Sequence, residues 1–147
     1  MARFISHWTQ YTSLFLIHDT GTGKSGSATA VFDGLIQYRP QLRTLYLSNN
    51  DTLLENFKTE ILRRSPYLQQ QWKLLDVSPD QYVPQRNRLL RDNHLSFYTY
   101  SKFASLLTKG RTLHATQYEN SLIILDEVHH LVVQELEKGK DKETDYH

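Results

Sequence analysis

Short apolar runs that alternate with helix-like stretches constrain the fold of this chain more than any other feature of its sequence. We expect these runs to be strands; they lie at residues 14–17, 44–48, 95–100 and 122–125. Strands separated by helices favour a parallel sheet with right-handed crossovers. We therefore expect an α/β fold, a mainly parallel sheet flanked by helices, that binds ligands beyond the carboxyl ends of its strands.

The segments between the first strands carry helical signals. Residues 25–38 are expected to form a helix that ends near Pro40, because helical geometry is disfavoured before a proline. After the second strand, Asn50 or Asp51 is a suitable N-cap for another helix. The apolar spacing that follows predicts one buried helical face, made of Leu53, Leu54, Phe57 and Ile61.

The pattern is less clear from residue 65 to residue 93. This segment can hold a short strand at 74–77 and a helix that ends near Leu90. Ser101 is expected to cap a helix that runs to about Leu107. A last helix is expected after the fourth strand, through Leu136.

The composition excludes several classes of protein. With 147 residues the chain has the size of one domain. Its 17 basic and 16 acidic side chains give a net charge of +1, so binding to nucleic acid needs a local patch. Cysteine is absent, which excludes disulfides and cysteine-based zinc sites. The apolar runs are far shorter than the roughly 20 residues of a membrane span, and no signal peptide is predicted.

The composition changes near the end of the chain. Residues 134–147 lose apolar content and mix charges, so we expect a polar and disordered tail there. Residues 1–133 are expected to form a single domain.

The segment HDTGTGKS at 18–25 joins the first predicted strand to the first predicted helix. Its glycines allow a tight turn with inward N–H groups, and the helix N-terminus adds amides and a positive dipole end. Lys24 can reach the β- and γ-phosphates of a nucleotide, and Ser25 can bind Mg²⁺. The candidate phosphate-binding residues are Thr20, Gly21, Thr22, Gly23, Lys24 and Ser25. The alternative is a flexible glycine turn with a solvent-facing lysine.

An acidic pair, Asp126 and Glu127, directly follows the fourth predicted strand. Mg²⁺ prefers oxygen ligands and keeps several waters, so a single carboxylate at a strand end suits it. We assign Asp126 as the carboxylate that faces Mg²⁺, and Glu127 as the general base that activates an attacking water. Taken alone, the pair could merely cap the next helix. Its combination with the lysine loop favours nucleotide chemistry.

Two adjacent histidines, His129 and His130, follow the acidic pair. Adjacent residues point about 100° apart on a helix, so they chelate a metal poorly without other ligands. A packed or hydrogen-bonded His130 is the simpler expectation.

The combination of GTGKS with DEVH resembles motifs I and II of superfamily 2 helicases and translocases, in the DExH-box group. That group tolerates a residue other than glycine where this chain has His18. Residues 45–57 are similar to motif Ia, and residues 95–103 are similar to a Thr-Tyr segment that often precedes motif II. Residues 118–127, YENSLIILDE, look especially like DExH NTPases of large DNA viruses, such as the poxvirus early-transcription type.

This resemblance implies a RecA-like ATP-binding domain with ATP and Mg²⁺ as cofactors. Lys24 and Ser25 would bind the phosphates and Mg²⁺, Asp126 would hold Mg²⁺, and Glu127 would activate water. His129 would couple the nucleotide state to a second domain. ATP hydrolysis would then drive movement along DNA or RNA, or transcription.

The resemblance also implies a nucleic-acid partner. Asn49, Asn50 and Thr99 would lie near the nucleic-acid backbone, although the first two also suit a turn and cap and Thr99 suits a strand. A basic cluster at 63–64, 86, 88 and 91 could contact nucleic acid as well. A solvated helix face is the simpler interpretation of that cluster.

Two parts of a complete helicase are not visible in this sequence: motif III and the second RecA-like domain, which carries an arginine finger. An arginine finger contributes about 10³–10⁵-fold to the rate. We therefore expect feeble ATPase activity at most, and no unwinding, from these residues without a second domain or partner subunit. No membrane partner is expected.

Two other functions stay open at this point. The chain could be a P-loop nucleotide-binding module without turnover, acting through a partner. It could also be another P-loop enzyme, such as a kinase or an AAA+ ATPase. The wide separation of the two motifs and the presence of His129 favour the helicase group.

Overall fold

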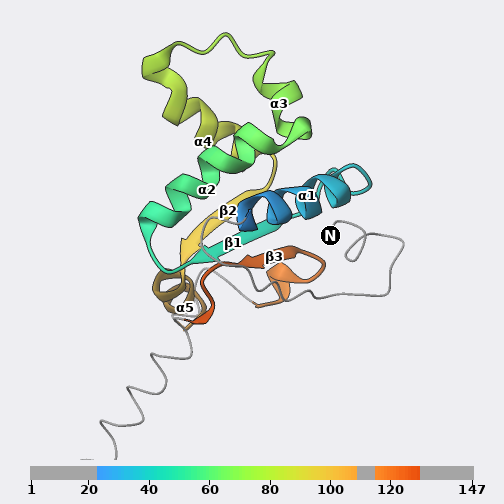
Figure 1. The fold of residues 1–147 in the computed structure, drawn as a ribbon. Coiled ribbons are helices and arrows are strands. Elements are labelled where there is room, and N and C mark those ends of the chain that lie inside the picture. The colour runs from blue at the N-terminus through green and yellow to red at the C-terminus, as the bar shows by residue number, and fades with distance from the viewer. Residues whose placement is uncertain (1–22, 109–114, 130–147) are drawn as a thin grey trace, which may run out of the picture.

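The computed structural model of the chain describes residues 23–108 and 115–129 (Figure 1). The predicted strand at 14–17, most of the glycine loop, His130 and the polar tail at 134–147 lie outside these residues. The domain boundary after residue 133 therefore stays a prediction. None of the helices in the described ranges is long and apolar enough to cross a membrane.

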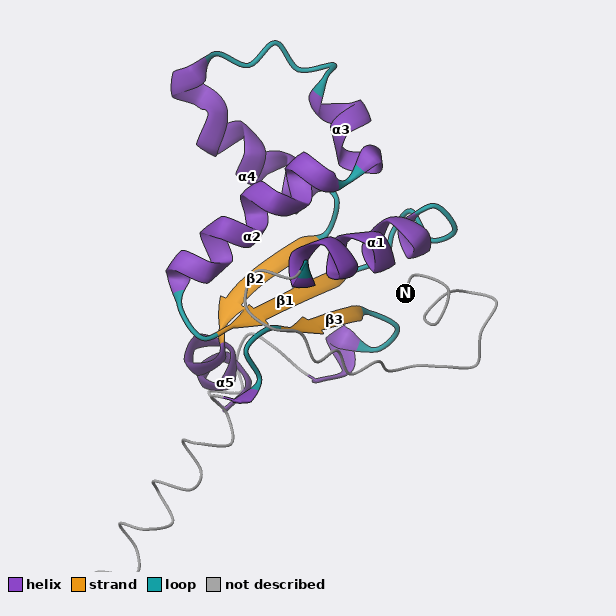
Figure 2. Cartoon of the chain, in the orientation of Figure 1, coloured by secondary structure: helices purple, strands orange, loops and turns teal. Residues whose placement is uncertain are grey.

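A parallel sheet forms the centre of the described fold. Strand β1 (Thr44–Ser48) lies in the middle, with β2 (Leu95–Thr99) on one side and β3 (Leu122–Leu125) on the other (Figure 2). Both neighbours run parallel to β1, and the register pairs Ser48 with Thr99 and Leu47 with Leu125. All three strands therefore end at the same edge. The predicted α/β class and mainly parallel sheet are confirmed.

Helices follow the strands in the expected alternation. Helix α1 (Lys24–Ile36) follows the glycine loop, α2 (Asp51–Arg64) follows β1, and α5 (Tyr100–Thr108) follows β2. Between α2 and β2 lie α3 (Pro66–Trp72), the short 3₁₀ helix η1 (Pro79–Gln81) and α4 (Tyr82–Asp92). A second 3₁₀ helix, η2 (Ala115–Tyr118), precedes β3. Figure 1 shows α1 and α2 side by side over the sheet, with α3 beyond α2.

The core lies between the helices and one face of the sheet. Its buried apolar side chains come from every layer and include Phe32, Ile36, Tyr46, Leu54, Phe57, Ile61, Leu68, Leu89, Leu90 and Leu95. On β3, Leu122 and Ile124 pack against this core, whereas Ile123 and Leu125 are about half exposed. The predicted face of α2 is confirmed at Leu54, Phe57 and Ile61, and Leu53 is half-buried.

Polar side chains at the strand ends start the next helices. Asn50 is the N-cap of α2, and its Oδ1 accepts a hydrogen bond from the Leu53 N–H at 3.0 Å. The prediction of Asn50 or Asp51 is thus resolved in favour of Asn50. At the start of α5, Thr99 Oγ1 accepts a hydrogen bond from the Lys102 N–H at 3.3 Å. The helix begins at Tyr100, and the prediction that Ser101 caps it is wrong.

The predicted strand at 74–77 is also wrong. Ser65 caps the additional helix α3 with Pro66 in its first turn, and the chain then leaves Trp72 in a turn. Leu74 is 85% exposed there. An apolar run becomes a strand through packing against neighbouring strands, and this segment lies away from the sheet. The predicted helix near Leu90 is confirmed as α4.

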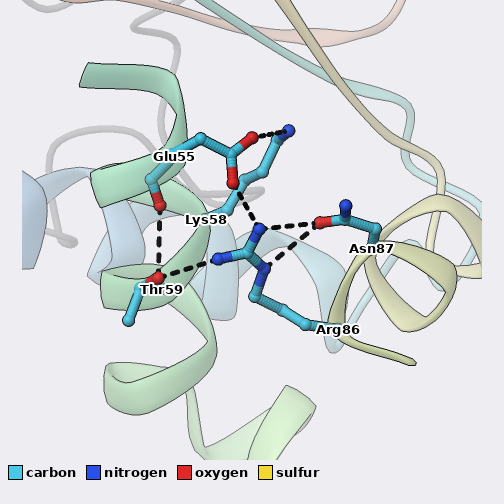
Figure 3. Close-up of polar contacts among 5 residues, drawn as sticks. All are labelled: Glu55, Lys58, Thr59, Arg86 and Asn87. Atoms are coloured by element: carbon cyan, nitrogen blue, oxygen red, sulfur yellow. Dashed lines mark hydrogen bonds and ion pairs between the residues drawn. The ribbon is translucent and has the colours of Figure 1, made fainter. Parts of the chain in front are cut away.

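A buried arginine joins α4 to α2. The Arg86 side chain is only 4% exposed, and its guanidinium forms an ion pair with Glu55. It also donates hydrogen bonds to Thr59 Oγ1 and Asn87 Oδ1, both at 2.9 Å (Figure 3). Lys58 contacts the same Glu55 carboxylate at 2.6 Å. Arg86 therefore belongs to the packing of two helices and not to an exposed basic patch.

Candidate functional site

The carboxyl edge of the sheet gathers residues from distant parts of the chain. Asp126 and Glu127 follow β3 directly, Asn49 follows β1, and Tyr100 follows β2. Lys24, the first residue of α1, reaches the same edge through its contact with Glu127. The described part of the predicted glycine loop and the predicted acidic pair thus meet in space.

Gly23 sets the start of α1. Its φ of 93° is in the left-handed region, which glycine adopts without the steric cost that a Cβ would bring. No side chain caps the helix at Gly23. The first N–H groups of a helix lack intrahelical partners, and together with the positive dipole end they favour an anion. Lys24 and Ser25 follow in this first turn, as the sequence predicts.

Lys24 and Glu127 form an ion pair across 103 positions of sequence. The Lys24 Nζ lies 2.9 Å from Glu127 Oε1, with the two side chains 35% and 26% exposed. The hydrogen bond that Lys24 donates to Glu127 raises the pKa of Lys24, with a smaller contribution from the charge of Asp126. The lysine is therefore held in its cationic form, which is the form that binds phosphate.

Glu127 sits on an unusual backbone. Its φ is 55°, a left-handed value that non-glycine residues seldom adopt. Such conformations cost roughly 1–3 kcal/mol and persist only where the surrounding structure holds them. His129 Nδ1 lies 3.2 Å from Glu127 Oε2, so the two carboxylate oxygens face two different basic groups.

Asp126 is held by two tyrosines that the sequence prediction did not include. The Tyr46 hydroxyl donates to Asp126 Oδ2 at 2.6 Å, and the Tyr100 hydroxyl donates to the Asp126 carbonyl at 2.8 Å. Burial, reinforced by the hydrogen bond to Asp126, raises the pKa of Tyr46 well above its usual range. Burial and the nearby carboxylates raise the pKa of Tyr100 to about 12. The hydroxyl of a tyrosine in a buried strand needs a hydrogen-bond partner, and this requirement was the one feature of the sequence that could have pointed to Tyr46.

The donor set suits a nucleotide with Mg²⁺. A cationic lysine and an uncapped helix N-terminus match phosphate oxygens. A carboxylate that stands beyond a strand end matches a hard cation, which takes oxygen ligands and completes its shell with water and phosphates. Thr20, Gly21 and Thr22 of the predicted loop lie outside the described residues.

The residues predicted to lie near nucleic acid have local contacts. Asn50 caps α2 and Thr99 caps α5, as described above, and Asn49 is half-buried after β1. These contacts support the cap interpretation for Asn50 and Thr99, and contact with nucleic acid stays a prediction for all three.

The predicted basic cluster is divided among acidic partners. Arg63 and Arg64 both contact Glu60, at 2.8 and 2.7 Å. Arg88 contacts Asp92 at 3.6 Å, and both side chains are exposed. With Arg86 buried, these contacts favour a solvated helix face over a single basic surface.

The fold and this edge define the class of protein: a RecA-like α/β domain in which a lysine at a helix start meets an acidic pair at a strand end. The chain belongs to the family described as type III restriction enzyme, res subunit, whose model matches residues 2–144.

The chain is also similar to helicase-named proteins of large DNA viruses, as its sequence predicts. It is 30% identical to protein 087L of Invertebrate iridescent virus 3 over 89% of its length, and 29% identical to protein 009L of Frog virus 3 (isolate Goorha) over 87%. It is 22% identical over 90% of its length to protein R563 of Acanthamoeba polyphaga mimivirus, which is named as an ATP-dependent RNA helicase. The chain spans 14%, 14% and 23% of these relatives, respectively. No solved structure gives a significant match.

Proposed function

We propose that this chain is the ATP-binding domain of a superfamily 2 DExH-box helicase or translocase. The family membership and the helicase-named relatives support a helicase-like ATP-binding domain. The observation that carries the finer assignment is the 2.9 Å contact between Lys24 and Glu127. It joins the lysine of the glycine loop to the acidic pair at one edge of the sheet.

In this proposal the start of α1 binds the nucleotide phosphates. Lys24 provides the charge, and backbone amides at Gly23 and beyond provide hydrogen bonds, together with the loop residues Thr20, Gly21 and Thr22. Ser25 and Asp126 would hold Mg²⁺. The Mg²⁺ held there would neutralise negative charge on the phosphates during transfer.

Glu127 is the proposed general base. While the Lys24 ammonium contacts Oε1, that oxygen is engaged and the carboxylate is stabilised as an anion. A phosphate group competes for the same ammonium, and its arrival releases Oε1 to accept the proton of the attacking water. General-base catalysis of this kind is worth about 10²–10⁴-fold.

The remaining roles concern coupling to other parts of a larger protein. His129, which contacts the second oxygen of Glu127, would pass the state of that carboxylate to a second domain. Asn49, Asn50 and Thr99 are the proposed contacts to a DNA or RNA backbone. A second RecA-like domain or partner subunit would supply an arginine finger and complete the catalytic site.

The test compares the unsubstituted chain with Glu127→Gln in ATP hydrolysis, with and without single-stranded nucleic acid and with the second domain supplied. We expect hydrolysis that nucleic acid stimulates, and a loss of about 10²–10⁴-fold in the variant with ATP binding retained. Equal activity of the two proteins would contradict the role of Glu127. Binding without any turnover would favour the alternative, a nucleotide-binding module that acts through a partner.

A further inference from the structure

The Tyr46 ring is fixed in the core beside the candidate site. Tyr46 is 3% exposed at the centre of β1. Its ring stacks on Phe57 of α2, with centroids 3.8 Å apart and planes 4° apart, and Phe97 of β2 lies 6.2 Å away. A ring packed from two sides has little freedom, so the position of its hydroxyl is well determined.

The hydroxyl is directed at one atom of the acidic pair. It donates a short hydrogen bond to Asp126 Oδ2, at 2.6 Å. Packing alone does not require this oxygen, because a phenylalanine would fill the same place beside Phe57. Burying a hydroxyl is costly without a partner. The contact therefore serves the carboxylate as well as the tyrosine.

The backbone of Asp126 is fixed at the same time. Its N–H donates to the Leu47 carbonyl at 2.9 Å, and its carbonyl accepts from the Tyr100 hydroxyl at 2.8 Å. Together with Tyr46, these contacts hold the amide, the carbonyl and one carboxylate oxygen of a single residue. Within the described residues no hydrogen bond to the other carboxylate oxygen, Oδ1, is found.

We propose that Tyr46 is a positioning residue that orients the Asp126 carboxylate toward Mg²⁺·nucleotide, with Tyr100 fixing the backbone of the same aspartate. This inference rests on the proposed function, which gives Asp126 the metal side of the site. Hydrogen-bond partners of metal-binding groups hold those groups in their productive orientation, and their loss typically costs about 10–100-fold in metal affinity or activity.

The test measures ATP affinity of the full chain, first without divalent cation and then across a Mg²⁺ titration. Tyr46→Phe removes the hydroxyl and keeps the stack on Phe57. We expect the ATP affinity of this variant without Mg²⁺ to stay within about twofold of that of the unsubstituted chain. The Mg²⁺ concentration that gives half of the maximal gain in ATP affinity should rise about tenfold. Tyr100→Phe is expected to raise this Mg²⁺ concentration by a smaller factor, since the variant keeps the contact between Tyr46 and the Asp126 carboxylate.

Tyr82→Phe is the matched control. Tyr82 packs edge-on against Trp72, with centroids 5.4 Å apart, far from the acidic pair in the fold, and its variant should leave the Mg²⁺ titration unchanged. Thermal unfolding of each variant separates folding from positioning. If Tyr46→Phe does not fold at the assay temperature, the half-buried Tyr100→Phe decides the matter by the same titration.

The outcomes separate the inference from the proposed function. A Mg²⁺ requirement that Asp126→Asn abolishes and that both tyrosine variants leave unchanged would overturn the positioning role alone. A Mg²⁺ requirement that survives Asp126→Asn, or a folded chain without Mg²⁺-dependent ATP binding, would overturn the metal-side role of Asp126 and the positioning role with it.

Discussion

The ammonium of Lys24 contacts Oε1 of Glu127 at 2.9 Å, although the two residues lie 103 positions apart. The contact joins the two halves of the candidate site. A nucleotide phosphate that binds the Lys24 ammonium must therefore displace its contact with Glu127. The affinity for phosphate is therefore a difference between two charge-assisted contacts, both of which favour the cationic lysine.

The left-handed Gly23 at the start of α1 gives a prediction about stability. Gly23→Ala should lower the free energy of unfolding by about 1–2 kcal/mol, because a residue with a Cβ is strained at φ 93°. No neighbouring atom lies within 4 Å of the added Cβ, so the cost comes from the backbone conformation alone. Gly34→Ala is the matched control: it lies inside α1 with open space around it and should stabilise by about 0.5–1 kcal/mol. Denaturant unfolding measures both. Equal effects would show that Gly23 does not need its conformation.

The buried Arg86 gives a second prediction. Arg86→Met should lower the free energy of unfolding by about 2–3 kcal/mol, because it removes the ion pair with Glu55 Oε2 and the hydrogen bond to Thr59 Oγ1, although Lys58 still contacts Glu55 Oε1. The cost stays below that of a fully buried pair, since the Glu55 side chain is 50% exposed. Arg88→Met is the control, because the Arg88 side chain on the same helix is 67% exposed. It should change the free energy of unfolding by less than about 0.5 kcal/mol. A similar loss in both variants would contradict the account.

The acid side chain of Glu60 gives a prediction about pH. Hydrogen bonds from Arg63 and Arg64 lower the pKa of Glu60 from 4.5 to about 2. A lowered pKa in the folded state stabilises the fold above the unfolded value and loses that contribution as pH falls through the folded value. The unfolding free energies of the chain and of Glu60→Gln should therefore converge between about pH 4.5 and pH 2. A constant difference over that range would contradict the ion pairs.

Local patterns in the sequence were sufficient to predict the strands at 44–48 and 122–125, the helix over 25–38 to within two residues, and the Asn50 cap. These depend on alternation, turn residues and capping, which act over a few residues. The meeting of Lys24 with Glu127 was also predictable, because parallel strands place their carboxyl ends at one edge. The family resemblance pointed to the same pair.

What the sequence did not reveal depends on contacts between distant residues. In the sequence Tyr46 is indistinguishable from other strand residues, and only the fold brings its hydroxyl to Asp126, 80 positions away. Arg86 reads as part of a basic cluster, and only the packing of α4 on α2 buries it against Glu55. The run at 74–77 has the composition of a strand, but Ser65 and Pro66 start a helix before it, and the run lies away from the sheet (Figure 1).

The most direct test of the central claim is ATP·Mg²⁺ binding to the folded chain, measured by calorimetry and compared with Lys24→Ala. Lys73→Ala, at an exposed lysine after α3, is the matched control. We expect the unsubstituted chain and the control to bind alike, and Lys24→Ala to bind about 10- to 100-fold more weakly, since a contact to a charged group is worth about 1.5–3 kcal/mol. Unchanged binding by Lys24→Ala, or no binding by the folded chain, would contradict the account.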